Sequence, residues 1–131
     1  MPGKLSVLTH KAPAPMPVLS QGVICNGMVY VSASLGIDPS TGRFVEGTVA
    51  DRTDQIFRNI SAVLQEADSG LKNIVKVNIF LTDMSNFQIM NEAYAKNFPE
   101  DVKPVRTCVA VEELPFGSDV EIGCIAALDA V

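Results

Sequence analysis

Basic residues, aromatic residues and histidine are scarce in this sequence. Ten Lys and Arg stand against fifteen Asp and Glu, a net charge of -5, and the basic residues form no run of the kind that binds a phosphate backbone. His10, the single histidine, lies beside a proline-rich stretch where packing would not hold it. A catalytic triad or a zinc site needs a histidine held by partners. We therefore expect neither a nucleic-acid partner nor a metal site.

Long hydrophobic runs and phosphate-binding glycine motifs are also missing. The apolar stretches are interrupted well before the roughly 20 residues needed to span a bilayer, and the glycines match neither G-x-G-x-x-G nor a Walker pattern. The N-terminus lacks the apolar core of a signal peptide. The cysteines, Cys25, Cys108 and Cys124, form no C-x-x-C pair, which fits a reducing compartment. We expect a soluble, cytoplasmic protein, with a mitochondrial location left open.

The sequence does have enough apolar residues to build a core. Its 131 residues (14.0 kDa) are 47% hydrophobic and 19% charged, with a mean hydropathy of +0.24. This length and composition predict one domain over residues 1–131. Three prolines in residues 11–17 predict an extended connection, so residues 1–17 are interpreted as a peripheral N-terminal segment.

Period-two patterns and turn residues predict the strands. The Asn26-Gly27 pair between two β-rich runs is a strong hairpin signal, and residues 38–42 form a second turn cluster, followed by a link over residues 43–47. In residues 74–81, alternation places Val75 with Val77, Ile79 and Leu81 on one side. The expected strands are residues 5–8, 22–26, 28–32, 74–81, 106–111 and 120–128.

Two segments carry helical periodicity. Residues 49–67 follow a capping box at Thr48 and Asp51, and Gly70 is the expected stop. A second capping box, Ser85 with Gln88, predicts a helix that ends at Pro99. The apolar stripe of this second helix comprises Phe87, Met90, Tyr94 and Phe98.

The predicted order β-β-β-α-β-α-β-β indicates an α+β sandwich: a mostly antiparallel six-strand sheet with two helices on one face. Two helices of about 10 Å diameter cover one face of a sheet about 24 Å wide, and the other face stays bare. Strands with apolar residues on both sides, such as Tyr30 beside Val29 and Phe80 beside Ile79, need a second covering. We therefore predict a homo-oligomer.

Arg106 and Glu121 are the candidate functional residues. Arg106 begins a strand of small and apolar residues, where its guanidinium suits a planar carboxylate. From spacing alone, an ordinary strand-end arginine that reaches solvent or pairs with a surface acid is the commoner case. Glu121 lies in a strand nearly free of charge and is either a cleft acid with a raised pKa or a counter-ion or edge residue. Cys108 is interpreted as a small core residue and not as a nucleophile.

Several motifs, in unbroken order from residue 20 to residue 128, resemble those of the reactive intermediate deaminase (Rid) family, also called the YjgF-type or liver perchloric-acid-soluble protein (L-PSP) family. They are V-Y-V-S at 29–32, I-V-K-V-N-I-F-L-T-D-M at 74–84, N-E-x-Y at 91–94, P-V-R-T-C-V at 104–109 and V-E-I at 120–122. The resemblance implies a chorismate-mutase-like fold assembled as a homotrimeric barrel, with clefts between subunits.

The resemblance also implies an activity that uses no metal or cofactor. Active members hydrolyse enamines and imines such as 2-aminoacrylate, released by pyridoxal-phosphate-dependent dehydratases, to 2-keto acids and ammonia. The resemblance therefore implies that the chain is a 2-iminobutanoate/2-iminopropanoate deaminase-like hydrolase. Arg106 would hold the substrate carboxylate, Glu121 would hold or activate water, Cys108 would line the cleft through its backbone, and Ser32 and Asn91 would shape the pocket.

Four positions depart from the family pattern and keep other functions open. Leu19 stands in the cleft where an aromatic hydroxyl is common, Ala33 and Ser34 replace Gly-Gln, and Gly123 replaces a second glutamate. Weaker or redirected activity would follow. A non-catalytic binder of small carboxylates or a chaperone-like interaction protein is the first alternative. An endoribonuclease or translation inhibitor is the second, and the charge of -5 argues against it.

Overall fold

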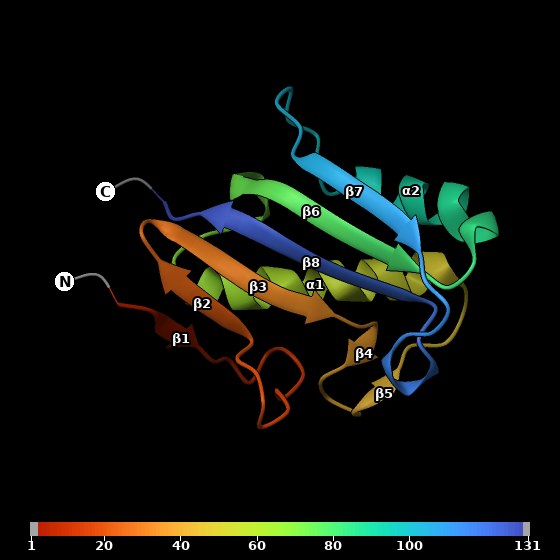
Figure 1. Cartoon of the computed structure of the whole chain (residues 1–131), viewed down its shortest axis with the longest axis horizontal. Coiled ribbons are helices and arrows are strands. Elements are labelled where there is room, and N and C mark those ends of the chain that lie inside the picture. The colour runs from red at the N-terminus through yellow and green to blue at the C-terminus, as the bar shows by residue number, and fades with distance from the viewer. Residues whose placement is uncertain (1–2, 130–131) are drawn as a thin grey trace.

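A computed structural model describes residues 3–129 of the chain, which form an α+β sandwich (Figure 1). The strands are β1 (Leu5–Val7), β2 (Gly22–Cys25), β3 (Met28–Ser34), β4 (Ile37–Asp38), β5 (Arg43–Phe44), β6 (Ile74–Leu81), β7 (Val105–Ala110) and β8 (Val120–Ala127). The helices are α1 (Val49–Glu66) and α2 (Phe87–Ala95), with short 3₁₀ helices η1 (Leu71–Asn73), η2 (Met84–Asn86) and η3 (Pro115–Gly117).

The main sheet has the strand order β1-β2-β3-β8-β6-β7, and only the β6–β7 pair within this described part is parallel. Both α-helices lie on one face of this sheet (Figure 1). The predicted α+β class, with six mostly antiparallel strands and two helices on one face, is therefore confirmed. Within residues 3–129, no helix is long and apolar enough to cross a membrane.

The core lies between the helices and the sheet because alternate residues of the central strands point toward α1 and α2. On β6 and β8 these buried residues are Val77, Ile79, Leu81, Val120, Ile122, Cys124 and Ala126. Phe57 of α1 meets Tyr94 edge to face, with ring centroids 5.8 Å apart, and this contact joins the two helices. Tyr30 and Val109, which point away from the helices, remain exposed.

Helix α1 begins at the predicted capping box. Thr48 Oγ1 accepts from the Ala50 amide at 3.1 Å, and the Thr48 amide donates to Asp51 Oδ2 at 2.9 Å. The acidic side chain also lies at the positive end of the helix dipole. This helix start is confirmed.

The predicted stop of α1 at Gly70 is wrong. The chain leaves the helix two residues earlier, at Asp68, which adopts a left-handed conformation (φ 57°). The amide of Ser69 donates to the Leu64 carbonyl at 2.8 Å and that of Asp68 to the Gln65 carbonyl at 3.1 Å, which closes the last turn. Aspartate tolerates this conformation better than most residues, so a glycine is not needed.

The capping box predicted for the second helix is also wrong. Asp83 accepts from the Ser85 amide at 2.9 Å and caps the 3₁₀ helix η2, from which α2 continues at Phe87 without a side-chain cap of its own. The helix ends at Ala95, before the predicted limit. Phe98 is nevertheless buried as the stripe predicted, because the chain continues along the core beyond the helix.

Two further differences arise from pairing between strands. β6 and β8 shift register between Ile74 and Lys76, so Ile74 is buried and Val75 is exposed, which reverses the predicted face of Val75. The predicted turn at residues 38–42 joins two short strands, β4 and β5, into a second sheet that the sequence analysis missed.

Candidate functional site

Arg106 lies on the edge strand β7 and points toward α2. Its register partner on β6 is Val77, which is buried beneath the helices, so the two side chains share that face. Nη1 of Arg106 donates to Asn91 Oδ1. The guanidinium carbon lies 4.7 Å from the ring centre of Tyr94 and 5.4 Å from that of Phe87. One amide and two aromatic faces thus hold the cation, while its remaining N–H groups are available to a ligand.

Cys108 lies two residues further along β7, on the same face as Arg106, and packs half-buried against the core. Burial raises the pKa of its thiol, and the nearby Arg106 cation only partly opposes this effect. A raised pKa keeps the group as a neutral thiol at neutral pH. The side chain therefore suits a lining role and not that of a nucleophile.

Glu121 lies on β8 and points to the opposite face of the sheet. Its neighbours Val120 and Ile122 are buried toward the helices, and its register partner is Phe80 of β6. Burial raises the pKa of the carboxyl. The ion pairs in the described part of the chain join other residues, so the alternative that Glu121 is a counter-ion to Arg106 is not realised within one chain.

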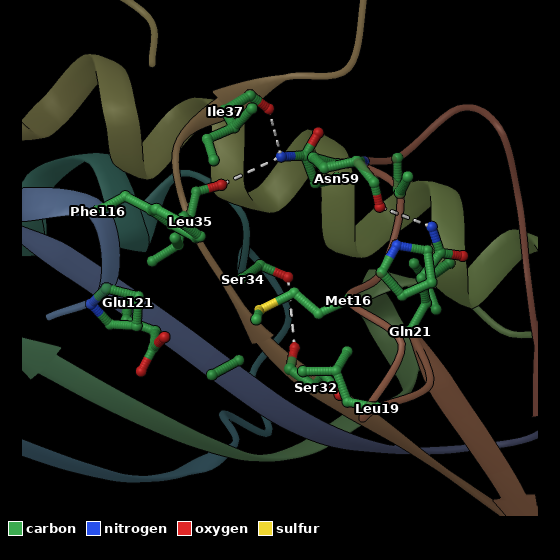
Figure 2. Close-up of a pocket in the computed structure, with 17 residues that line it drawn as sticks. Met16, Leu19, Gln21, Ser32, Ser34, Leu35, Ile37, Asn59, Phe116 and Glu121 are labelled. Carbon is green, nitrogen blue, oxygen red and sulfur yellow. Dashed lines mark hydrogen bonds between the residues drawn. The ribbon is translucent and has the colours of Figure 1, made fainter. Parts of the chain in front are cut away.

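Glu121 borders a cavity of about 190 Å³ at the end of β3 and β8 (Figure 2). Its walls come from four places: the segment before β2, the end of β3 with the chain that follows, helix α1, and the loop before β8. Leu19 and Ser32, two of the predicted site residues, line this cavity together with Glu121. A cavity of this size can hold a small organic acid.

The predicted residues thus form two separate groups. Arg106, Asn91 and Cys108 are together at β7 and α2, whereas Glu121, Ser32 and Leu19 line the cavity. Strand β6 lies between β7 and β8, and Arg106 and Glu121 point to opposite faces of the sheet. One chain therefore does not bring its arginine and its glutamate to one ligand.

The sequence analysis missed most of the cavity residues, among them Met16, Gln21, Asn59 and Phe116. Gln21 and Asn59 are buried polar residues, a signal that is not visible before burial is known. No role was predicted for Phe116, which lies between the strands expected at residues 106–111 and 120–128. Among residues 3–129, no three His, Cys, Asp or Glu side chains form a group that could hold a metal ion.

Comparison with known proteins places these groups in context. A family model described as Endoribonuclease L-PSP matches residues 9–128. A RutC family protein of Aquifex aeolicus is 44% identical over 121 residues, 92% of this chain and 96% of that protein. The chloroplastic Reactive Intermediate Deaminase A of Arabidopsis thaliana is 39% identical over 122 residues, 93% of this chain and 65% of that protein. The crystal structure of E. coli TdcF with bound serine superposes with a TM-score of 0.89 and 31% identity, covering 95% of this chain and 99% of TdcF.

Proposed function

Because the chain belongs to the Endoribonuclease L-PSP family, of which one relative is named Reactive Intermediate Deaminase A, we propose that it hydrolyses 2-enamine and 2-imine acids to 2-keto acids and ammonia. The substrates are of the 2-aminoacrylate type, which tautomerises to the imine. The observation that carries the proposal is the pair of groups on the two faces of the sheet: a guanidinium with free donors and a carboxyl with a raised pKa.

The reaction is a hydrolysis without redox change. The oxygen of water attacks C2 of the imine, the C–O bond forms, and the π electrons of the C=N bond move to nitrogen, which takes a proton. The hydroxyl proton of the resulting carbinolamine passes to the amino nitrogen as the C–N bond breaks, so that ammonia leaves and the 2-keto acid remains. Positioning and one proton relay suffice because the imine carbon is already electrophilic.

Arg106 is proposed to bind the substrate carboxylate. A guanidinium pairs with a planar carboxylate through two parallel N–H···O bonds, which also orient the imine. Asn91 and the ring of Tyr94 hold the cation from the side of α2. Glu121 is proposed to accept the proton of the attacking water, a role that a partly desolvated carboxylate performs well near neutral pH.

A complete site then needs two copies of the chain, and we propose a homotrimer with the sites between subunits. The sheet face opposite the helices carries exposed Tyr30, while Val105 and Val109 are exposed on edge strand β7. Large apolar side chains on a sheet face or an unpaired edge are typical of a protein interface. Packing of one subunit's β7 edge near the next subunit's cavity would bring Arg106 and Glu121 to one ligand.

The test is a coupled assay in which a serine/threonine dehydratase generates the enamine while semicarbazide traps the free imine. We expect sub-stoichiometric protein to suppress semicarbazone formation, and Arg106→Ala to lose about 100-fold or more in kcat/KM because a charge-assisted pair is removed. The exposed Arg43 provides the matched control, and Arg43→Ala should behave as the unchanged protein. Equal semicarbazone formation with and without the protein would refute imine hydrolysis.

A second candidate, binding of small carboxylates without catalysis, is favoured by one comparison: the similar E. coli TdcF was crystallised with serine. Leu19, in place of an aromatic hydroxyl, fits this function as well. The variant Glu121→Gln distinguishes the two functions. Catalysis is lost in this variant, whereas carboxylate binding measured by calorimetry is retained. RNA cleavage, which the family's description names, fits poorly with a net charge of -5.

A further inference from the structure

We propose that Phe116 is a specificity-determining residue, which makes the cavity select imino acids with apolar side chains over those with small or polar ones. The inference rests on the proposed function and ranks its substrates: 2-iminopropanoate, the imine tautomer of 2-aminoacrylate, is hydrolysed, but imino acids with larger apolar side chains are preferred. Three features of the structure carry it: the backbone of Phe116, the anchoring of its loop, and the chemistry of the cavity wall.

The backbone of Phe116 is in a conformation that an aromatic residue rarely adopts. Its φ and ψ are 59° and 23°, and Gly117 follows with φ 73°. The Ser118 amide donates to the Pro115 carbonyl at 3.1 Å, so Phe116 and Gly117 are the central residues of a turn of type I′ geometry. Asn, Asp and Gly are usual at these positions, and bulky residues are outliers.

The ring gains little burial in return, since Phe116 is 70% exposed. A strained, exposed aromatic residue is not explained by the stability of the fold, and such residues concentrate at functional sites. Phe116 borders the cavity next in sequence to Pro115 and from the same loop that leads to Glu121 (Figure 2). Because Phe116 is both exposed and part of the cavity wall, its ring can contact a bound ligand.

The loop that carries Phe116 is anchored at its far end. Asp119 accepts two hydrogen bonds from Arg52 of α1, from Nε and Nη2, both at 2.8 Å. Ser118 Oγ donates to the Val120 carbonyl at 2.7 Å, which ties the turn to β8. A bidentate ion pair and a buried hydroxyl limit the positions available to the ring, and a fixed ring selects ligands better than a mobile one.

The cavity wall offers few free polar groups to a ligand. Gln21 donates to the carbonyls of Thr9 and Pro13, and Asn59 donates to those of Leu35 and Ile37. The hydroxyl protons of the two lining serines are also committed: Ser32 donates to the Ser20 carbonyl at 2.6 Å and Ser34 to the Ser32 carbonyl at 3.3 Å.

The rest of the wall is apolar, apart from Glu121. It includes Met16 and Leu19 from the segment before β2, and Leu35 and Ile37 after β3. Figure 2 shows Phe116 and Glu121 toward one side of the cavity, with Met16 and Leu19 toward the other. If Glu121 holds the water, the substrate's side chain meets apolar surface, and a hydroxyl on that side chain would lose its hydration without a donor to replace it.

The experiment compares two imines generated in place by an L-amino-acid oxidase, one from leucine and one from alanine, with semicarbazide as the competing trap. The readout is the ratio of kcat/KM for the leucine imine to that for the alanine imine. We expect a ratio above one in the unchanged protein and a fall of about tenfold in Phe116→Ala, since each methylene in an apolar pocket contributes about tenfold or more. Phe116→Leu should retain most of the ratio.

A matched control variant tests whether the change in the ratio is specific to Phe116. Leu5→Ala removes another exposed apolar side chain, on β1 away from the cavity, and should leave the ratio unchanged. If both imines are hydrolysed and Phe116→Ala keeps the ratio, the role of Phe116 is overturned while the proposed function stands.

If neither imine is hydrolysed, the proposed function fails. Calorimetry then tests the role of Phe116 separately, by comparing the binding of two stable keto acids. Tighter binding of 4-methyl-2-oxopentanoate than of pyruvate, lost in Phe116→Ala, would support selection by Phe116 in a binding protein. Equal binding of the two acids, or a preference that survives Phe116→Ala, would overturn it.

Discussion

Arg52 and Asp119, 67 positions apart in the sequence, form a bidentate pair with both N···O distances at 2.8 Å. Nη1 of Arg52 also donates to the carbonyls of Val45 and Gly47, at 3.2 Å each. One guanidinium therefore ties helix α1, the segment before it and the loop before β8 together. Of these elements, α1 and the loop before β8 contribute to the cavity wall.

Replacing Asp119 should loosen this end of the molecule. We expect Asp119→Asn to lower the free energy of unfolding by about 1–2 kcal/mol, because a partly buried, charge-assisted pair is lost. The ratio of leucine-imine to alanine-imine hydrolysis should fall with it, since Phe116 is then less restrained. Denaturant titration provides the measurement.

Asp54 offers the matched control for this change. It pairs with Lys96 at 3.3 Å, and Lys96 is largely exposed, so Asp54→Asn should cost at most about 0.5 kcal/mol. Equal losses of stability in the two variants would show that the Arg52 pair has no special structural role.

Gly36 passes directly over the side chain of Arg52. A Cβ at this position would lie 2.6 Å from Arg52 Cβ and 2.8 Å from its Cα, so Gly36→Ala should destabilise the fold by about 1–3 kcal/mol. Gly70→Ala is the control, since a Cβ at Gly70 meets nothing within 4 Å. Thermal unfolding of both variants tests this, and a normal melting temperature for Gly36→Ala would contradict it.

Phe116→Asn should make the protein more stable and less selective. Asparagine tolerates the left-handed region, so the strain of about 1 kcal/mol at this position is relieved while an exposed ring is lost. Denaturant titration should show a higher midpoint, together with a reduced leucine-to-alanine ratio. A lower midpoint would mean that the ring packs favourably and that the backbone strain has been misjudged.

The activity should depend on pH through Glu121. A carboxyl that accepts a proton from water works in its deprotonated form, so activity falls as the pH drops through its pKa. Burial raises this pKa above the ordinary 4.5, and the loss should therefore begin at a higher pH than for an exposed glutamate.

The measurement is a profile of kcat/KM against pH, corrected for uncatalysed hydrolysis. Glu121→Gln should lower activity about 100-fold or more and remove this inflection. Full activity of the unchanged protein down to pH 4.5 would argue against Glu121 as the base.

Mixing two inactive variants tests whether sites are shared between subunits. Arg106→Ala and Glu121→Gln should each be inactive alone, but refolding them together yields some interfaces with an intact Arg106 from one subunit and an intact Glu121 from the next. Random assembly would restore about a quarter of the sites. If the mixture stays inactive while the unchanged protein survives the same treatment, a shared site is contradicted.

Local chemistry within the sequence was enough to predict most elements. The helix start at Thr48 and Asp51 and the hairpin at Asn26-Gly27 depend on neighbours in the chain, so their residues predict them directly. The period-two and helical patterns likewise predicted the six main strands and two helices. Motifs spread over the whole chain pointed to the family.

The tertiary structure decided what depends on partners far apart in the sequence. The exposure of Val75 follows from pairing with β8, and the chain just after α1 is held by a distant partner, because Ser69 Oγ donates to the Ala127 carbonyl at 2.6 Å. Alternation along each strand shows which neighbouring residues share a face with Arg106 or with Glu121. Only the strand order and register show that Arg106 and Glu121 point to opposite faces of the sheet.

The cavity and the position of Phe116 also depend on the tertiary structure. Four separate segments meet there, and the ion pair between Arg52 and Asp119 holds the loop that carries the ring. A sequence encodes the periodicity of each element, which is a local property. Non-local packing determines which side of each helix or strand is covered. It therefore also determines which distant side chains meet and where a cavity forms.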